Sequence, residues 1–535
     1  CTRGGHQRVR GHICVFAAPS PDIPGHLHGK LMIDNLRFRR QFLLSNEIVE
    51  GLPGWQFHEL EGHYLYAHPD LSVTPERGPS CLIVLLGDIF EPLYPERTNH
   101  EILMRLALQT TNFTQLLRCI KGCVGCYVII YKDQANFNIV HDPLGLREVY
   151  YCTKPNKVIA GSQPNLLSEF SEPKLNTTSD TAVVKFYSVD VPKVRSGRLW
   201  VGDETYYDQI RHLMPNHYLD VQLLVSKRYW PDRELETLDL DTAVSRTCAQ
   251  LKGALRAITL RHKVMMAVTA GVDSRSLLAA SREVSDKIYY FINKKPPLTD
   301  ESADIRIPRA IMERLGLPFH IHEVVGPVDR AFRDVFLQNT FMSSDLLLPA
   351  IYNVYYKNHQ DKVNLLGVGE IGREYYGDAP KNLTGYYLAH CLRYRDSAYA
   401  VMQCEKWLQE VKSITKEHNV DIMQLFLWEM LLGNWGAVGN SESDIAIEEI
   451  DPYDSHLIYE TMLSVSPEHT RGSLPNLFRA MFREMWPELL EFPFNPRDGY
   501  VDRIVGLLAD IGIYGRLKKV KYWIDYARFG RNVRL

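Results

Sequence analysis

The fold is decided by Val264-Met265-Met266-Ala267-Val268-Thr269-Ala270-Gly271-Val272-Asp273-Ser274-Arg275, where an apolar run changes to small residues, an acid and a hydroxyl. Residues 264–268 are apolar without alternation, which is typical of a parallel strand covered by helices on both faces. The small residues 269–271 allow a tight turn and close approach of the backbone to a ligand. A helix is expected over 274–281, with its N-terminal N–H groups facing the turn. The stretch therefore predicts a buried strand that ends in an anion-binding turn.

Asp273 adds a carboxylate beside the expected anion, and this is repulsive unless a cation such as Mg²⁺ lies between the two. A magnesium nucleotide satisfies both requirements. The sequence has no Gly-x-x-x-x-Gly-Lys-Ser/Thr motif and no Gly-x-Gly-x-x-Gly opening a helix, so the two commonest phosphate loops are excluded. The alternative is a turn between strand and helix that is capped by its own hydroxyl groups and binds no ligand.

The turn resembles the pyrophosphate loop of the ATP-pyrophosphatase family, Ser-Gly-Gly-x-Asp-Ser, with conservative changes at the first two positions. The resemblance implies that ATP binds here and adenylates a substrate, with release of pyrophosphate. It also implies that Asp273 is a catalytic residue and a Mg²⁺ ligand. The residues expected to contact the phosphates are Thr269, Ala270, Gly271, Val272, Asp273 and Ser274.

A second glycine-rich stretch, Gly367-Val368-Gly369-Glu370-Ile371-Gly372-Arg373, follows the apolar run 363–366. It resembles the Gly-x-Gly-x-Asp-Glu loop of the same family, with Glu in place of Asp and displaced by one position. Glu370 is expected to be the second Mg²⁺ ligand, Gly369 to contact the nucleotide, and Arg373 to stabilise phosphate charge. The alternative is an ordinary glycine-rich turn with a structural Glu–Arg pair.

The segments around these loops predict a parallel α/β sheet that binds its ligand at the C-terminal edge of the strands. Apolar runs over 287–292 and 319–324 predict two further strands, separated by a helix that starts after 299–302 and ends at Gly316. A mostly helical C-terminal part follows. In the turn 448–455, Glu449 and Asp451 are interpreted either as ligands of a substrate amine or as a solvated acidic turn. The resemblance also implies a late lysine near the phosphates. The candidates are Arg497, Lys518, Lys519 and Lys521, of which the three lysines also fit a solvated basic face.

The first 230 or so residues predict an α+β sandwich. Short apolar runs at 81–86, 126–131 and 149–152 are bounded by turn residues, and a helical pattern interrupts them at 98–108. Cys119, Cys123 and Cys126 have a spacing that also occurs in iron–sulfur sites, but the run into a strand at 126 favours core packing.

Several segments of this region resemble, in order, those of class II glutamine amidotransferase domains: 87–90, 99–103, 122–127 and 142–151. Together with the phosphate loop, this order resembles the asparagine synthetase family, including β-lactam synthetases. The resemblance implies an N-terminal nucleophile-type sandwich over 1–236 and an ATP-pyrophosphatase (synthetase) domain over 237–535, with a linker at 237–241.

Three departures indicate a degenerate glutaminase domain. A working domain of this class uses an N-terminal cysteine whose own amine acts as base, together with donors for the oxyanion. Cys1 is present, but a polar, basic stretch follows it. Leu86 stands where the oxyanion-stabilising asparagine is expected, and Asn99 stands where an aspartate would hold the glutamine amine. We therefore expect no glutaminase activity.

The expected function is an ATP-dependent ligase that adenylates a small-molecule or peptide carboxylate and joins it to an amine, with ATP and Mg²⁺ as cofactors. The alternatives are a glutamine-hydrolysing asparagine synthetase and a non-catalytic structural protein. The chain has 535 residues and a formal charge of −3 without long runs of one sign, so neither nucleic-acid nor membrane binding is expected. A cytoplasmic protein is expected, and a homodimer is left open.

Overall fold

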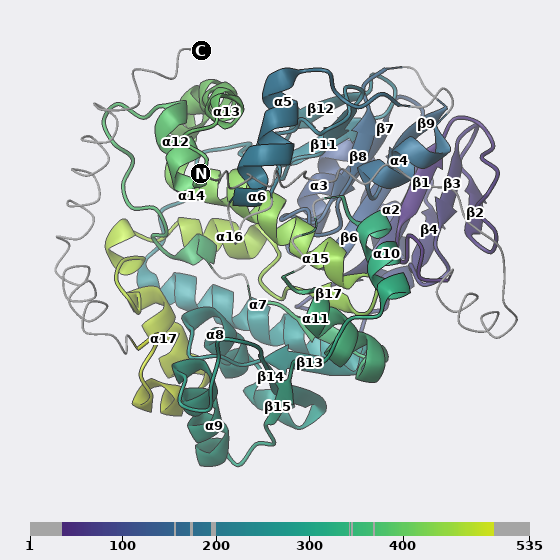
Figure 1. The fold of residues 1–535 in the computed structure, drawn as a ribbon. Helices are drawn as coiled ribbons and strands as arrows, with labels where there is room; N and C mark the ends of the chain where they lie inside the picture. Colours follow the sequence, from purple (N-terminus) through teal and green to yellow (C-terminus); the bar gives the residue numbers. More distant parts are fainter. Residues whose placement is uncertain are drawn as a thin grey trace, which may run out of the picture.

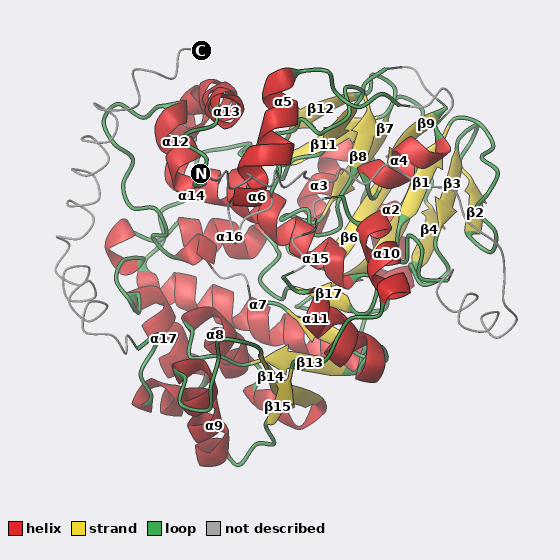
Figure 2. Ribbon diagram, viewed as in Figure 1, coloured by secondary structure: helices red, strands yellow, loops and turns green. Residues whose placement is uncertain are grey.

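The computed structural model describes residues 35–154, 157–171, 175–193, 199–341, 343, 346–367 and 370–496. Two antiparallel sheets come first along the chain, and a parallel sheet surrounded by helices follows (Figures 1 and 2). This order confirms the predicted succession of an α+β region, a parallel α/β region and a helical C-terminal part. Cys1 and Gly369 lie outside the described residues, and so do Arg497 and the three candidate lysines.

The two antiparallel sheets have six strands each. The first has the order β10 (Ile210–His212), β8 (Tyr150–Cys152), β9 (Val158–Gly161), β1 (Phe42–Ser45), β3 (Tyr64–Ala67) and β2 (Gln56–Glu59). The second has the order β12 (Val225–Arg228), β11 (His217–Asp220), β7 (Phe137–His141), β6 (Val124–Lys132), β5 (Leu82–Phe90) and β4 (Val73–Arg77). Apolar side chains from both sheets, such as Phe42, Leu86 and Val128, form one buried cluster. The N-terminal region is therefore a sandwich.

Two helices cover the other face of the second sheet. Helix α2 (Asn99–Gln109) begins with a capping box between Thr98 and Glu101, which satisfies N–H groups at its first turn. Helix α3 (Phe113–Ile120) follows and buries its apolar side in the same cluster. The helix predicted from the sequence over 98–108 is confirmed.

The parallel sheet has the order β15 (His320–Glu323), β14 (Ile288–Lys294), β13 (Val264–Ala267), β16 (Val363–Leu365) and β17 (Glu448–Ile450). All four pairings are parallel. Along β13, Val264 and Met266 belong to one core cluster and Met265 to another. The strand is thus covered on both faces, as its unbroken apolar run predicts.

The helices that follow the sheet's strands form its cover and the C-terminal part. Around the sheet lie α7 (Leu240–Arg261), α8 (Val272–Ala280), η2 (Arg282–Lys287), α9 (Ala303–Leu315), α10 (Arg330–Asn339), α11 (Leu348–Ala350) and η3 (Ile351–Tyr356). Further on come η4 (Glu370–Gly372), α12 (Gly385–Cys391), α13 (Ala398–Glu417), α14 (Ile422–Phe426), η5 (Leu427–Gly436), α15 (Ala437–Ser443), α16 (His456–Leu463), η6 (Pro467–His469), α17 (Asn476–Met485) and η7 (Pro487–Glu491). The N-terminal region contributes α4 (Pro164–Phe170), α5 (Thr181–Lys185), η1 (Phe186–Asp190) and α6 (Val191–Lys193).

The linker expected at 237–241 is shorter in the structure. Asp239 accepts a hydrogen bond from the N–H of Thr242 and caps α7, so the helix already starts at Leu240. An aspartate at this position replaces a missing intrahelical partner, which favours the earlier start. The last two residues of the expected linker therefore belong to α7.

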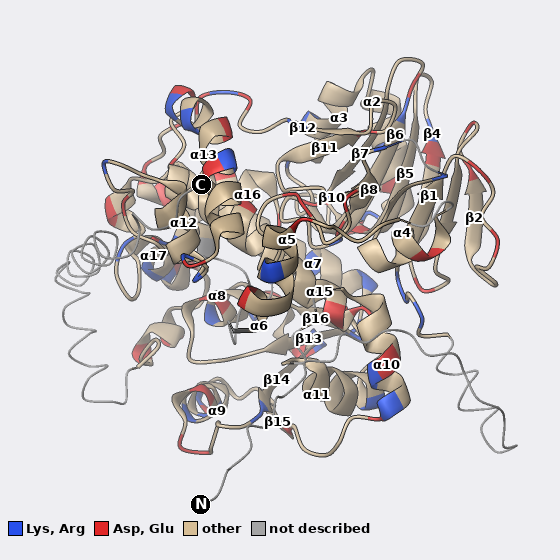
Figure 3. Cartoon of the chain, turned by 45° about the horizontal axis from the view of Figure 1, so that its top comes forward, with Lys and Arg blue, Asp and Glu red and all other residues tan. Residues whose placement is uncertain are grey.

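Lys and Arg positions and Asp and Glu positions are interspersed along the helices, α13 among them (Figure 3). Among the described residues, no helix combines the length and the apolar character needed to cross a membrane.

Candidate functional site

The parallel sheet has a topological switch point between β13 and β16. From β13 the chain continues to β14 and β15 toward one edge, whereas from β16 it continues to β17 toward the other. In open parallel sheets the loops that leave the C-terminal ends of two such strands diverge and form a crevice, where ligands bind. The two predicted loops, 269–274 and 367–373, are the loops at this point.

The two loops are in contact. A Cβ atom added to Gly367 would lie 3.3 Å from the carbonyl oxygen of Asp273 and 3.2 Å from Leu277. Glycine therefore allows the backbone after β16 to approach the first turn of α8 closely. Sequence analysis predicts this meeting of two segments about 95 residues apart in the chain, since both follow neighbouring strands.

Helix α8 starts at Val272, two residues before the predicted start, with Gly271 as its N-cap and no side chain capping it. The acidic Asp273 lies in the first turn, where the positive end of the helix dipole favours it. The motif therefore runs into the helix itself and is not a loop that precedes it.

The turn before α8 is held by its own polar groups. The hydroxyl groups of Thr269 and Ser274 lie 2.8 Å apart, and the N–H of Thr269 donates to Ser274 Oγ at 3.1 Å. The N–H of Gly271 donates to Thr269 Oγ1 at 3.1 Å. The N–H of Ala270 donates to a carboxylate oxygen of Asp304 at 3.0 Å. An anionic oxygen thus already lies against the backbone of this turn, and the chain itself supplies it.

Asp273 forms an ion pair with Arg373 across the two loops, with Nη2 and Oδ2 3.2 Å apart. The two side chains are only 19% and 20% exposed, so this pair is far more enclosed than an ordinary surface pair. Burial raises the pKa of Asp273 above its usual value, and the Arg373 guanidinium opposes that rise. The other carboxylate oxygen, Oδ1, is buried and has no hydrogen-bond partner among the described residues.

The described residues do not fit a Mg²⁺ site. The group that faces Asp273 from the second loop is a guanidinium, and a dication placed there would be repelled. Within the part of the chain that the structure describes, no three His, Cys, Asp or Glu side chains lie close enough to hold a metal ion. Glu370 is the first residue of η4, and its side chain lies outside the described residues, so the predicted pairing of Asp273 with Glu370 stays a prediction.

Arg275 supports the site through contacts with the segment 489–494, a role that the sequence did not predict. Its guanidinium donates to the carbonyl groups of Leu489, Phe492 and Pro493 and lies over the ring of Phe494, 3.5 Å from its centre. The side chain is fully buried, and burial lowers its pKa to about 9. The same segment then crosses the turn, where the N–H of Asn495 donates to the carbonyl of Ala270 at 3.0 Å. In the sequence, the arginine directly after the motif was the signal that could have indicated this role.

A cleft opens on the other side of the second loop. It leaves a cavity of about 60 Å³ and is lined by Ile371 from the second loop, by Tyr375 and Tyr376 just after it, and by Met423 and Leu427 from α14 and η5. The acidic side chains of Glu374, Asp378 and Asp421 and the basic Arg471 also line it. Gln424, another lining residue, donates to the carbonyl of Arg373 at 2.7 Å. The cleft and the Asp273–Arg373 pair therefore share one backbone segment.

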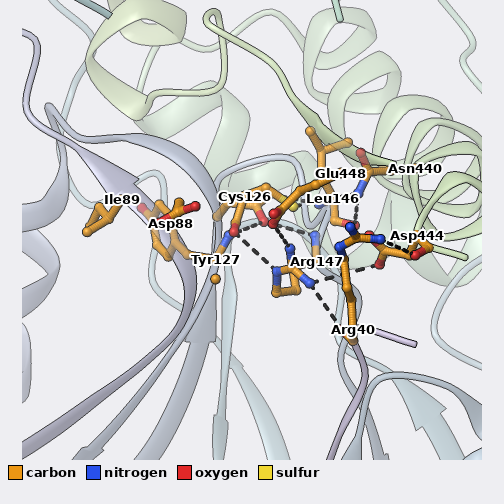
Figure 4. Close-up of polar contacts among 12 residues, drawn as sticks. Arg40, Asp88, Ile89, Cys126, Tyr127, Leu146, Arg147, Asn440, Asp444 and Glu448 are labelled. Carbon is orange, nitrogen blue, oxygen red and sulfur yellow. Dashed lines mark hydrogen bonds and ion pairs between the residues drawn. The ribbon is translucent and has the colours of Figure 1, made fainter. Parts of the chain in front are cut away.

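The turn 448–455 is not a solvated acidic turn, which corrects one interpretation of the sequence. Glu449 is 6% exposed and accepts a hydrogen bond from Asn364 at 2.7 Å, and burial raises its pKa to about 7. Asp451 is fully buried and accepts from the N–H of Tyr453. The reason is that the N-terminal sandwich packs over this edge strand, with Arg147 paired to Glu448 (Figure 4).

The residues at the positions that a glutaminase would use make other contacts within the protein. Leu86 is fully buried in the sandwich core, and the adjacent N–H of Gly87 donates to the carbonyl of Ser72 at 2.8 Å. Asn99 is buried and bonded to Asp88, to the N–H of Ile89 and to Arg261. These groups are therefore not free to bind a glutamine or an oxyanion.

The three clustered cysteines do not converge. Cys123 and Cys126 are buried in different core clusters, and Cys119 is partly exposed. Burial raises the pKa of the Cys123 thiol to about 12, so the thiolate that metal binding needs is disfavoured. These contacts agree with core packing.

No protein-family model and no curated protein matches the chain. Two solved structures are similar to it in part. The allosteric regulatory enzyme of purine biosynthesis has 12% identity and a TM-score of 0.22 over 57% of this chain and 65% of its own. The glutamine phosphoribosylpyrophosphate amidotransferase from B. subtilis, in complex with ADP and GMP, has 10% identity and a TM-score of 0.19 over 57% of this chain and 66% of its own. In both cases the chain spans less than two thirds of the similar protein's length, and the TM-scores are low.

Proposed function

We propose that the chain is an ATP-dependent carbon–nitrogen ligase that adenylates a carboxylate and releases pyrophosphate. The observation that carries the proposal is the meeting of the pyrophosphate-loop-like turn 269–274 with the second loop at the switch point of a parallel sheet. Residues in the first turn of α8 offer backbone N–H groups to phosphate oxygens, and Arg373 offers a fixed positive charge.

The cleft beside the second loop is where we place the carboxylate or the amine. Its apolar floor of Ile371, Met423 and Leu427 excludes water from part of the space, which protects an activated acyl group from hydrolysis. Since this cleft and Arg373 share a backbone segment, a substrate seated there lies next to the nucleotide phosphates and is held for attack.

The amine is proposed to come from a second substrate, from the same molecule or from free ammonia, and not from glutamine. The commitments of Gly87 and Asn99 to contacts within the sandwich support this part of the proposal. The substrates are proposed to be small molecules or peptides, and the sequence names neither the acid nor the amine.

The proposal is tested by exchange of labelled pyrophosphate into ATP in the presence of pooled carboxylic acids. Exchange is expected in the wild type and is expected to be lost in Asp273→Ala, because the carboxylate that orients Arg373 is gone. Asp361→Ala is the matched control, since Asp361 forms an exposed pair with Lys263 on the surface.

Two outcomes would replace the proposal. Failure to bind ATP under any condition would favour a non-catalytic protein, in line with the internal bonds of Ala270 and Gly271. Glutamate release from glutamine that is lost in Cys1→Ala would favour a glutamine-hydrolysing asparagine synthetase.

A further inference from the structure

We propose that Arg373 takes the place of a divalent metal at this site, so that the nucleotide phosphates bind without Mg²⁺. The inference rests on the proposed function and concerns the charge that makes phosphate binding possible there. Asp273 puts a negative charge at the first turn of α8, and phosphates beside it require a cation. The chain supplies that cation itself, 3.2 Å from the Asp273 carboxylate.

The position of Arg373 is fixed by the packing of the second loop. A Cβ atom added to the preceding Gly372 would lie 2.0 Å from the end of the Met462 side chain and 3.4 Å from Phe478, so the loop is packed closely against both side chains. The carbonyl of Arg373 is held by Gln424, and the next N–H, that of Glu374, donates to the carbonyl of Thr470 at 2.9 Å. A backbone anchored on both sides of Arg373 keeps its side chain directed at Asp273.

Arg373 is the residue of the second loop that contacts Asp273. A carboxylate there would need a metal ion between the two acids, whereas an arginine pairs with Asp273 directly.

The pair differs from the surface ion pairs of the same molecule. Arg256 and Glu283 on α7 and η2, for example, are 54% and 52% exposed, against 20% and 19% for Arg373 and Asp273. A purely structural pair would also leave little unsatisfied, yet Asp273 Oδ1 is buried without a partner among the described residues. A guanidinium has five N–H groups and binds phosphate oxygens in a bidentate manner, so it can contact Asp273 and a phosphate together.

The test is calorimetric titration of the whole chain with ATP, once in excess EDTA and once in excess Mg²⁺. The wild type is expected to bind ATP in EDTA with an affinity within about threefold of that in Mg²⁺. Arg373→Asp restores two facing carboxylates, so its binding in EDTA is expected to fall by about tenfold or more and to recover when Mg²⁺ is added. Arg373→Gln removes the charge without adding a carboxylate and is expected to bind weakly in both conditions.

Arg256→Asp is the matched control, because it reverses the charge of an exposed arginine far from the loops, and it is expected to behave as the wild type. Circular dichroism checks that each variant is folded. If Arg373→Asp is not folded, Arg373→Lys, which keeps the positive charge, is titrated in its place. Wild-type binding that needs Mg²⁺ would overturn the inference and leave the proposed function standing. No binding in either condition would overturn the proposed function itself.

Discussion

The two regions in which sequence patterns suggest ligand chemistry differ in how their polar groups are used. Around β5 and α2, the N–H of Gly87 and the side chains of Asp88 and Asn99 are bonded within the chain. At the ends of β13 and β16, Asp273 and Arg373 remain partly exposed beside a cleft, and one carboxylate oxygen of Asp273 has no partner among the described residues. The first region has the arrangement of a structural core, and the second has that of a binding site.

Whether the residues of a motif can bind a ligand depends less on their identity than on the groups of the protein to which they are already bonded. Buried polar groups that are fully satisfied add stability and specificity of packing, but they offer nothing to a ligand. A polar group at a switch point that lacks a partner within the protein can still bind a ligand.

The largest effect is expected for Arg147→Met, in the closed region. Arg147 is 3% exposed, donates to the carbonyl groups of Cys126 and Arg40, and pairs with Glu448 and Asp444 (Figure 4). Without it two carboxylates stay buried and unpaired, so the free energy of unfolding is expected to fall by about 3–5 kcal/mol. Urea unfolding followed by circular dichroism measures this.

The control for Arg147 is Arg77→Met, which removes an exposed arginine paired with Glu61 and is expected to cost less than about 1 kcal/mol. If the two variants lose similar stability, the contacts of Arg147 do not hold the sandwich to the edge strand, and the description of a closed region is wrong.

Glu148→Gln is expected to change the pH dependence of stability. Glu148 is buried, and burial raises its pKa to about 7 although Ser441, Tyr150 and Gln163 donate to it. A carboxyl whose pKa is raised in the folded state stabilises that state at low pH, and the contribution is lost as the pH rises toward 7. Glutamine carries no such loss, so the variant should gain on the wild type by up to about 3 kcal/mol between pH 4.5 and pH 8.

Comparing the two proteins at each pH is necessary because buried histidines act in the opposite direction. Burial lowers the pKa of both His212 and His456 to about 3, so their contribution is lost as the pH falls below their usual value. His456 is unchanged in the variant and cancels in the difference, whereas His212 Nε2 lies 3.8 Å from Glu148 Oε1, so the difference reports on Glu148 and His212 together. A constant difference from pH 4.5 to pH 8 would show that folding does not shift the pKa of Glu148.

Asp304→Ala tests whether the region at the ends of β13 and β16 is open to a ligand. The carboxylate of Asp304 accepts the N–H of Ala270 and therefore competes with a phosphate oxygen for it. Its removal is expected to tighten ATP binding by about threefold to tenfold, the value of one hydrogen bond. Titration calorimetry measures the change, with Glu313→Ala, an exposed acid on the same helix, as the control. Weaker binding would mean that Asp304 builds the turn and does not compete with the ligand.

The smallest effect on glutamine hydrolysis is expected for Leu86→Asn, which restores an amide at the oxyanion position but places it in the sandwich core, so circular dichroism first checks that the variant is folded. No release of glutamate from glutamine is expected in either protein, because the N–H of Gly87 and the side chain of Asn99 stay committed. A coupled glutamate dehydrogenase assay measures this. Glutamate formation in the variant alone would show that the region is closed only by the loss of one side chain.

Local patterns were enough to predict four of the five strands of the parallel sheet, whereas β17 lies where the sequence was interpreted as a turn. The apolar run before Thr269, the helix that ends at Gly316 and the strand before Gly367 all lie where the sequence indicates, because burial on both faces and a left-handed glycine cap leave local signatures. The meeting of the two loops follows from the rule that ligands bind where parallel strands diverge.

Contacts between distant segments were not predictable in the same way. Nothing in the sequence near Asp273 shows that Arg373 would pair with it, or that Asp304 would bond to Ala270. The burial of Glu449 depends on the sandwich packing over β17, which is a property of the assembled fold. Which carboxylates are solvated and which are buried is therefore decided by tertiary packing, not by local composition.

The central claim is that the crevice between β13 and β16 binds the nucleotide while the region of β5 and α2 binds neither nucleotide nor glutamine. Hydrogen exchange followed by mass spectrometry, with and without ATP and with and without glutamine, tests it directly. The account predicts that ATP slows exchange in peptides covering 269–281 and 366–378 and that glutamine changes nothing in 82–109. Unchanged exchange at 269–281 with ATP, or protection of 82–109 by glutamine, would contradict it.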